Sequence, residues 1–243
     1  MRSLQAAAPI GMSAEPASVP RVGLRGIRKQ YGPTTALDGV DFDARAGEIH
    51  ALLGENGAGK STLMQILAGL TQPTAGEIEL EGVRCPLSSP REARRLGIAM
   101  VHQHFTLVPA FSIAENLALD TPTRGWQGPR LYRARKAAAA ALDYARSLGW
   151  ELPADTRVAD LSVGAQQRVE IVKALATDAR TLIFDEPTAV LSRSEIEELF
   201  TVLRRLRDSG RTVILIAHKL AEILAVADMS PSYGVGSEWP TYP

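Results

Sequence analysis

The sequence predicts an α/β protein: a mostly parallel sheet flanked by helices, with a helical subdomain inserted into it. Short and nearly continuous apolar runs recur at 48–53, 97–101, 181–184 and 212–217, as expected of strands that are covered on both faces. Helical patterns separate these runs, and helices between such strands indicate a parallel sheet. The 243-residue chain is long enough for one large domain.

The composition narrows the class of protein. Apolar residues make up 45% and charged residues 22%, which is ordinary for a globular protein, and Lys+Arg and Asp+Glu both total 27. The zero net charge gives no support for a protein that coats nucleic acid. The lone cysteine, Cys85, excludes a disulfide framework and a cysteine-based zinc site. No apolar run approaches the roughly 20 residues that span a bilayer, and we expect residues 1–20 to be a disordered lead-in rather than a signal peptide.

The first strong strand, at 48–53, leads into a glycine-rich turn, after which the pattern predicts a helix over 61–70. Farther along, no strong strand signal occurs between about 115 and 160. One helical face is formed there by residues at gaps of three and four: Leu131, Ala134, Ala138, Leu142, Ala145 and Leu148. Gly149 is a natural stop for this helix. We therefore predict that residues 106–160 are a helical insertion into the α/β core.

A second strong helical pattern runs from 193 to 208. Ser192 and Glu195 have the spacing of a capping box at its start, and Gly210 ends it. The apolar stripe of this helix consists of Ile196, Leu199, Phe200, Leu203 and Leu206. A stripe of this kind predicts that one face of the helix is buried.

The glycine-rich turn matches the pattern G-x-x-x-x-G-K-[ST], and it lies between a strand and a helix, as a phosphate-binding loop requires. The matching residues are Gly54, Glu55, Asn56, Gly57, Ala58, Gly59, Lys60 and Ser61. The N–H groups of such a loop and the N-terminus of the following helix attract phosphate. We expect Lys60 to reach the β- and γ-phosphates, the Ser61 hydroxyl to ligate Mg²⁺, and Thr62 to belong to the same nucleotide site.

Two carboxylates, Asp185 and Glu186, follow the apolar run at 181–184. A carboxylate at the C-terminal end of a buried parallel strand faces the ligand crevice. We expect Asp185 to hold Mg²⁺ and Glu186 to orient and polarise an attacking water; a solvated acidic pair is the alternative. His218 follows the run at 212–217 and is predicted to lie at the same sheet edge. A hydrogen bond to the γ-phosphate is its functional interpretation, and a structural histidine is the alternative.

The segment 161–168 reads LSVGAQQR, and with it the sequence resembles the ATP-binding subunit of ABC transporters over about residues 20–228. The resemblance implies a P-loop NTPase core with an N-terminal antiparallel β portion, and ATP and Mg²⁺ as cofactors. It implies that Tyr31 stacks on adenine and that Gln103 contacts Mg²⁺ and the attacking water. It also implies that Gln103 couples to a membrane subunit and that His218 is a switch histidine.

The same segment predicts a second anion site. Ser162 can cap a helix and Gly164 leaves its backbone N–H open, although a simple helix cap is the alternative. The resemblance implies that this site binds the γ-phosphate of ATP held by an opposing nucleotide-binding domain. Three features depart from the family pattern: Ala165 replaces the usual Gln or Glu, Val163 replaces the more general Gly, and the stretch 189–192 lacks the usual Asp.

Several phrases are similar to the simple-sugar and nucleoside importer branch of the family: GEIHALLGENGAGKSTLM, GIAMVHQHFTLVP, LSVGAQQRVEI, DEPTAVL and AHKL. The implied partners are transmembrane permease subunits, a second nucleotide-binding domain and, indirectly, an extracytoplasmic solute-binding protein, with no nucleic acid. The implied location is the cytoplasmic face of the cell membrane, as a peripheral subunit. The alternatives are a soluble ABC-type ATPase that acts away from the membrane and an inactive remnant that only binds ATP.

The last residues, 229–243, have no strand or helix periodicity, and the resemblance stops near Asp228. One permitted codon string for this stretch, read two bases later, gives V-T-V-L-R-R-G-E-R-V-A, a credible continuation of the family pattern. We therefore expect a nucleotide-binding domain at 21–228 followed by a frameshifted tail, in a chain that is the first half of a tandem ATPase. A true alternative C-terminus is the competing interpretation.

Overall fold

The computed structural model describes residues 19–54, 57–103, 105–119, 130–217 and 225–226. A four-stranded parallel sheet lies at its centre, in the order β3-β8-β7-β6. These strands are β3 (Ile49–Leu53), β8 (Thr212–Ala217), β7 (Thr181–Asp185) and β6 (Ile98–Val101). They are the apolar runs of the sequence, each within one residue of its predicted bounds, and the predicted α/β class is confirmed.

Both faces of the parallel sheet are covered, because its side chains alternate between two hydrophobic cores. In β8, Val213 and Leu215 belong to one core, whereas Ile214 and Ile216 belong to the other. Every residue of β7 and β8 is buried. This double burial explains why the sequence shows continuous apolar runs at these strands instead of alternation.

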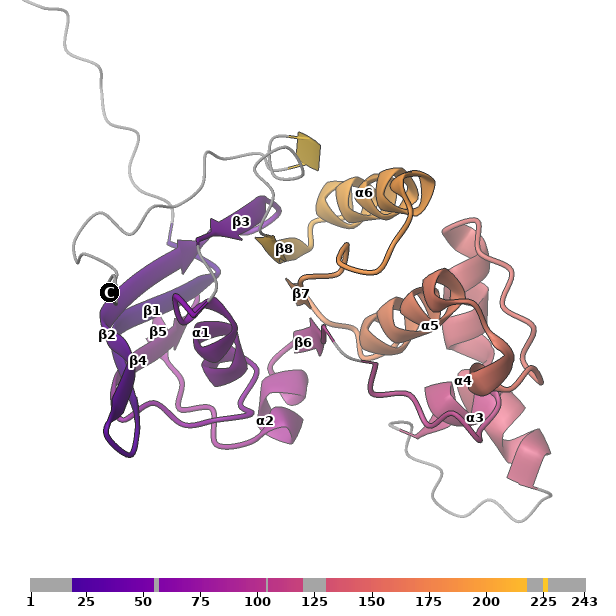
Figure 1. Ribbon diagram of the computed structural model, residues 1–243, viewed down its shortest axis with the longest axis horizontal. Coiled ribbons are helices and arrows are strands. Elements are labelled where there is room, and N and C mark those ends of the chain that lie inside the picture. The colour runs from indigo at the N-terminus through magenta and orange to yellow at the C-terminus, as the bar shows by residue number, and fades with distance from the viewer. Residues whose placement is uncertain (1–18, 55–56, 104, 120–129, 218–224, 227–243) are drawn as a thin grey trace, which may run out of the picture.

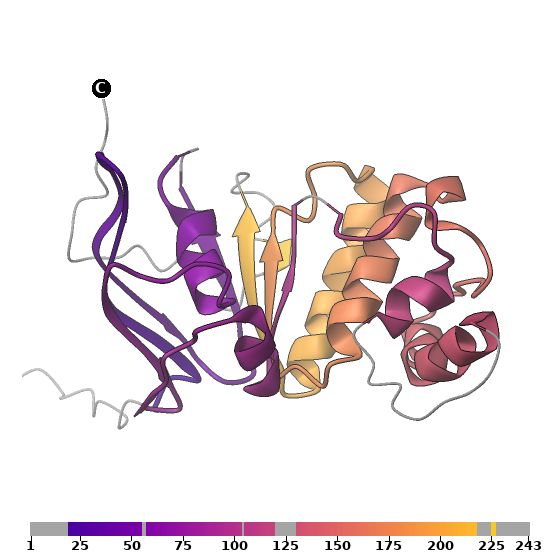
Figure 2. The same ribbon diagram turned by 90° about the horizontal axis from the view of Figure 1, so that it is seen from below.

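Helices cover both faces of the parallel sheet, and the helices on one face are longer than those on the other (Figures 1 and 2). Helix α1 (Lys60–Leu67) and the short helix α2 (Pro90–Arg95) contribute to one core, while α5 (Val163–Leu175) and α6 (Arg193–Asp208) contribute to the other. Helix α1 ends earlier than the helix predicted over 61–70, because Gly69 adopts a positive φ of 71° just beyond the end of α1. The larger core lies between the sheet and α5 and α6, on the side away from α1.

The region predicted to be helical contains α3 (Ile113–Ala118), α4 (Arg130–Ser147) and a short 3₁₀ helix, Val158–Asp160, and it packs against α5 (Figure 1). In the described part of 106–160, an isolated bridge between Ser112 and Arg157 is the only β pairing. The helix predicted over 131–148 is thus displaced by one residue, and a φ of 87° at Gly149 supports the predicted stop. None of the helices in the described ranges combines the length and the apolar character needed to cross a bilayer.

A separate antiparallel sheet has the order β2-β1-β4-β5. Its strands are β2 (Thr34–Ala44), β1 (Val22–Tyr31), β4 (Ala75–Leu80) and β5 (Val83–Arg84). The N-terminal antiparallel portion implied by the resemblance is present, but no strand signal marked β4 or β5. In β4 only Ile78 is fully buried, and β5 is exposed, so neither strand carries the apolar pattern that identifies buried strands.

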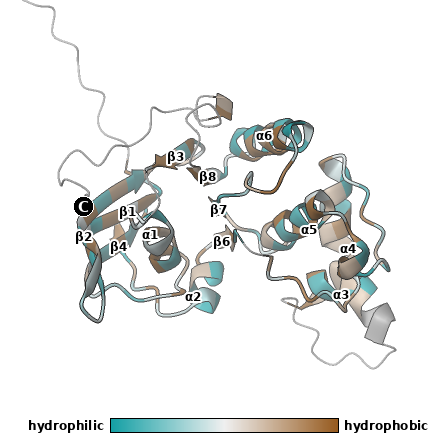
Figure 3. Cartoon of the chain, viewed as in Figure 1, coloured by the Kyte–Doolittle hydropathy of each residue, from teal (hydrophilic) through white to brown (hydrophobic). Residues whose placement is uncertain are grey.

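Helix α6 has the predicted bounds and the predicted cap. The Ser192 hydroxyl accepts a hydrogen bond from the Glu195 backbone, and the Glu195 carboxylate accepts one from the Ser192 backbone. Leu199, Phe200 and Leu203 are buried against the sheet. Figure 3 shows hydrophilic and hydrophobic residues on different sides of this helix, in agreement with the stripe in its sequence.

Candidate functional site

The predicted phosphate loop lies between the end of β3 and the start of α1, beside the end of β7. Its described residues line a pocket at the carboxyl edge of the parallel sheet, together with one strand residue and one acidic residue. The lining residues are Ala36, Gly57, Ala58, Gly59, Lys60, Ser61, Thr62 and Glu186. Glu55 and Asn56 lie outside the described residues.

Lys60 is a buried cation at the base of this pocket. Its side-chain exposure is low, with 5% of the residue accessible, and its Nζ donates to the carbonyl of Gly54 at 2.7 Å. Burial lowers the pKa of Lys60, and the nearby charges of Glu186 and Asp185 oppose that shift. A buried ammonium beside the N-terminus of a helix favours an anionic ligand such as phosphate.

Two oxygen atoms meet next to this lysine. The Ser61 hydroxyl donates to Oδ1 of Asp185 at 3.0 Å, and only 5% of Asp185 is exposed. Burial raises the pKa of Asp185, while the hydrogen bond from Ser61 lowers it and the charge of Glu186 raises it further. A hydroxyl and a carboxylate placed in this way fit Mg²⁺, which prefers oxygen ligands and is usually held by one or two protein groups plus phosphate oxygens.

Glu186 follows Asp185 and projects into the pocket. Nε2 of Gln103 donates to Oε2 of Glu186 at 3.0 Å, so the residues that follow β6 and β7 meet in this contact. The backbone of Glu186 has a φ of 49°, which is uncommon for a residue other than glycine, and its N–H is held by the carbonyl of Ile216 at 3.1 Å. A strained backbone of this kind is typical of functional sites.

Tyr31 lies apart from the pocket lining. It ends β1, is 48% exposed, and has the ammonium of Lys29 at 4.9 Å from its ring centroid. The antiparallel sheet instead touches the phosphate loop through Ala36 of β2. His218 lies outside the described residues, as does the tail at 229–243.

The predicted second anion site lies on α5. The Ser162 hydroxyl accepts a hydrogen bond from the backbone of Ala165 at 3.3 Å and caps the helix. Gly164 was expected to present an open backbone, but it is buried beneath the carboxylate of Glu195 from α6, which is held there by its own capping box. Neither Ser162 nor Gly164 lines the phosphate-loop pocket.

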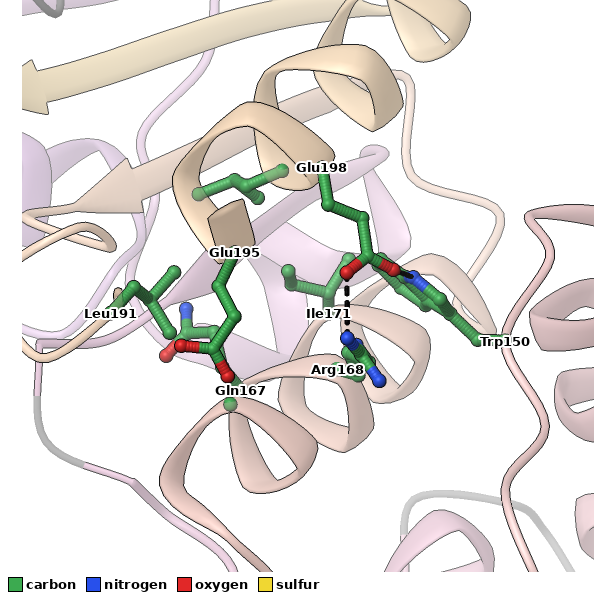
Figure 4. A pocket seen from close by; sticks show the side chains of 9 residues that line it. Trp150, Gln167, Arg168, Ile171, Leu191, Glu195 and Glu198 are labelled. Carbon is green, nitrogen blue, oxygen red and sulfur yellow. Dashed lines mark hydrogen bonds and ion pairs between the residues drawn. The ribbon is translucent and has the colours of Figure 1, made fainter. Parts of the chain in front are cut away.

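The contact between α5 and α6 centres on Glu198 (Figure 4). Its carboxylate accepts hydrogen bonds from Arg168 of α5, at 2.6 Å, and from the indole Nε1 of Trp150, which follows α4. One acidic side chain thus joins the helical region, α6 and α5; because α5 begins within the segment 161–168 that carries the family resemblance, we call α5 the signature helix. Sequence reasoning did not identify this contact, because nothing in the spacing of the three residues marks them as neighbours.

Gly164→Ala tests the packing of Glu195 on the signature helix. A Cβ at position 164 would lie 1.8 Å from Oε1 and 2.7 Å from Cδ of Glu195, so the carboxylate must leave its capping box. We expect a loss of about 1 kcal/mol in the free energy of unfolding, the usual value of a helix cap. In a Glu195→Ala background the same change should be neutral or stabilising, because alanine is the better helix former. Equal losses in both backgrounds, measured by urea denaturation, would show that the two residues are not coupled.

Comparison with known proteins assigns the chain to a protein family. A family profile described as ABC transporter matches residues 37–189, which is more than half of the chain. The chain belongs to the ABC transporter family.

The relatives are import proteins of that family. The ribose import ATP-binding protein RbsA 3 of Rubrobacter xylanophilus is 51% identical over 210 residues, which are 86% of this chain and 42% of that protein. The nucleoside import ATP-binding protein NupA of Lactococcus lactis is 48% identical over 202 residues, which are 83% of this chain and 39% of that protein. The chain therefore spans less than half the length of the curated relatives it matches.

Solved structures agree on the fold. A nucleotide-free ATP-binding cassette from an ABC transporter superposes with a TM-score of 0.76 at 25% identity, covering 86% of this chain and 85% of that chain. A dimeric ATP-binding cassette in a post-hydrolysis state, bound to ADP and Pi, superposes with a TM-score of 0.68 at 27% identity, covering 84% of this chain and 91% of the other. The P-loop α/β fold implied by the resemblance is confirmed.

Proposed function

We propose that residues 21–228 form a nucleotide-binding domain of an ABC importer, which binds and hydrolyses MgATP to energise uptake of a simple sugar or a nucleoside. The observation that carries this proposal is that Lys60, Ser61 and Glu186 line one pocket. Asp185 is hydrogen-bonded to Ser61, and Gln103 is hydrogen-bonded to Glu186. The names of the relatives support sugar or nucleoside as the class of solute.

The residues divide the chemistry between them. Lys60 and the loop N–H groups bind the phosphates of ATP, while Ser61 and Asp185 hold Mg²⁺. When bound, Mg²⁺ neutralises charge on the phosphate oxygens. Glu186 orients a water whose oxygen bonds to the γ-phosphorus as the bond to the ADP oxygen breaks, and its carboxylate accepts the proton released. Gln103 positions the Glu186 carboxylate through the 3.0 Å hydrogen bond.

A second nucleotide site is proposed at the start of α5. Ser162 stands at the N-terminus of α5, outside the phosphate-loop pocket, and we propose that this helix end binds an ATP molecule other than the one in that pocket. For Gly164 to take part, the Glu195 carboxylate that covers it has to move aside. We propose that an opposing nucleotide-binding domain supplies this ATP and that transmembrane permease subunits receive the resulting motion. In this arrangement the chain is peripheral, on the cytoplasmic face of the membrane, with a solute-binding protein on the other side. Tyr31 and His218 keep their proposed contacts with adenine and γ-phosphate.

The test of this function is nucleotide binding and hydrolysis by the full chain. We expect the chain to bind MgATP in calorimetry and to release phosphate, and Asp185→Asn to lower the affinity for MgATP more than the affinity for ATP in EDTA. That difference is expected because the substitution removes a metal ligand and leaves the phosphate loop intact. Equal effects with and without Mg²⁺ would contradict the metal role, and absence of nucleotide binding would contradict the proposed function.

A further inference from the structure

A buried carboxylate on α5 holds the segment that follows Gln103. Only 4% of Glu170 is exposed, yet its carboxylate accepts hydrogen bonds from the backbone N–H and the hydroxyl of Thr106. The hydroxyl contacts lie at 2.9 Å and 3.2 Å from the two carboxylate oxygens. Thr106 is three residues beyond Gln103, in the connection between β6 and α3.

A second polar anchor holds the same connection a little farther on. Asn116 of α3 is fully buried, and its side chain both accepts from the N–H of Val108 at 2.7 Å and donates to its carbonyl at 3.1 Å. The connection is therefore attached to α5 at Thr106 and to α3 at Val108. Among the described residues these two anchors belong to the helical side of the molecule, whereas Gln103 contacts Glu186 on the sheet side.

The burial of Glu170 destabilises the fold unless its carboxylate is hydrogen-bonded or paired, because a buried carboxylate loses its favourable hydration. Three basic side chains, Arg94, His102 and Lys173, line the same cavity as this carboxylate. An apolar side chain would fill the position without that cost. We therefore attribute the presence of a carboxylate at this position to its hydrogen bonds with the segment that follows Gln103.

We propose that Glu170 is a positioning residue for hydrolysis, which ties Gln103 to α5 so that the position of the signature helix sets the position of Gln103 against Glu186. Glu170 is bonded to Thr106, which is three residues after Gln103 in the sequence, and Gln103 is bonded to the Glu186 carboxylate. Helix α5 also carries Ser162 and Gly164 at its start, two turns before Glu170. A nucleotide bound at that start is thereby linked to the water-orienting carboxylate of the same chain. This inference rests on the proposed function.

The experiment compares ATP hydrolysis by the full chain with Glu170→Ala, Glu170→Gln, Gln103→Ala and the Gln103→Ala/Glu170→Ala pair. We expect Glu170→Ala to lower kcat about tenfold with little change in KM for ATP, because it misplaces a catalytic group without touching the phosphate loop. Glu170→Gln keeps an acceptor for Thr106 and should retain most of the activity. In the Gln103→Ala background, Glu170→Ala should cause no further loss, because residues that act through one another are not additive. Additive losses, or a loss in KM alone, would overturn the proposal.

Lys173→Gln is the matched control, since it changes a charge on the same helix and in the same cavity without reaching Thr106. It should retain full activity. Amide hydrogen exchange separates this inference from the proposed function: if the unmodified chain hydrolyses no ATP, the hydrolytic function fails, but Glu170→Ala should still speed exchange at the Thr106 amide about tenfold or more. Unchanged exchange at that amide would overturn the tether whatever the hydrolysis assay shows.

Discussion

Glu186→Gln is expected to leave MgATP binding nearly unchanged and to lower the rate of hydrolysis by about 10²–10³-fold. The substitution keeps the size of the side chain and its hydrogen bond with Gln103, but it removes the carboxylate that accepts the proton of the attacking water. The phosphate loop and the pair of Ser61 and Asp185 are untouched, so the affinity for nucleotide should be preserved. Phosphate release over several turnovers and calorimetric titration with MgATP measure the two quantities on the same preparation.

Glu197→Gln is the control for this substitution. Glu197 is an exposed glutamate on α6 whose ion pair with Arg193 spans 3.6 Å, so its neutralisation removes one negative charge without altering the pocket. It should hydrolyse ATP at the unmodified rate. A Glu186→Gln chain with an unchanged rate would exclude Glu186 from catalysis, and a chain that no longer binds MgATP would assign it a role in binding instead.

The parallel sheet could be predicted because the strands that build it are buried on both faces. The signals that predicted these elements are local: a continuous apolar run, a glycine after a helix, or a capping box before one. The structure places β8 and α6 at their predicted bounds. The strands β4 and β5 lack such a signal, because β4 has few buried residues and β5 is exposed. In the described sheet β4 pairs with β1, and β5 pairs with β4. The pairing of β4 depends on a partner about 50 residues away, which the local pattern does not contain.

The functional site likewise contains residues that the sequence could predict and residues that it could not. A glycine-rich loop and an acidic pair at a strand end follow from topology, because parallel strands deliver their carboxyl ends to one edge of the sheet. Ser61 and Asp185 are 124 positions apart in the sequence and lie 3.0 Å apart in the fold. Glu170 and Glu198 were missed, because an acidic residue inside an amphipathic helix is usually solvated. The burial of Glu170 and its bond with Thr106 reveal what it holds, and the bonds with Arg168 and Trp150 do so for Glu198.

Among glycine-to-alanine substitutions in the phosphate loop, Gly59→Ala is expected to cause the largest loss in the free energy of unfolding. Gly59 is the N-cap residue of α1 and has a φ of 80°, and a Cβ there would lie 2.6 Å from the carbonyl oxygen of Ala36 and from Cδ2 of Leu37. Both neighbours belong to β2, and a backbone carbonyl in a paired strand cannot move aside at low cost. We expect a loss of about 3–5 kcal/mol in the free energy of unfolding, from left-handed strain together with overpacking.

Gly57→Ala is the matched variant that separates the two causes. Gly57 has nearly the same φ, 84°, but among the described residues, its chain neighbours aside, no atom lies within 4 Å of the position that its Cβ would take. Its replacement should therefore cost only the left-handed strain, about 1–2 kcal/mol. Urea denaturation of both variants without nucleotide gives the difference, and MgATP titration shows whether the loop still binds phosphate. Equal losses of stability would mean that the contact with β2 adds nothing, and that the antiparallel sheet does not support the phosphate loop through Ala36.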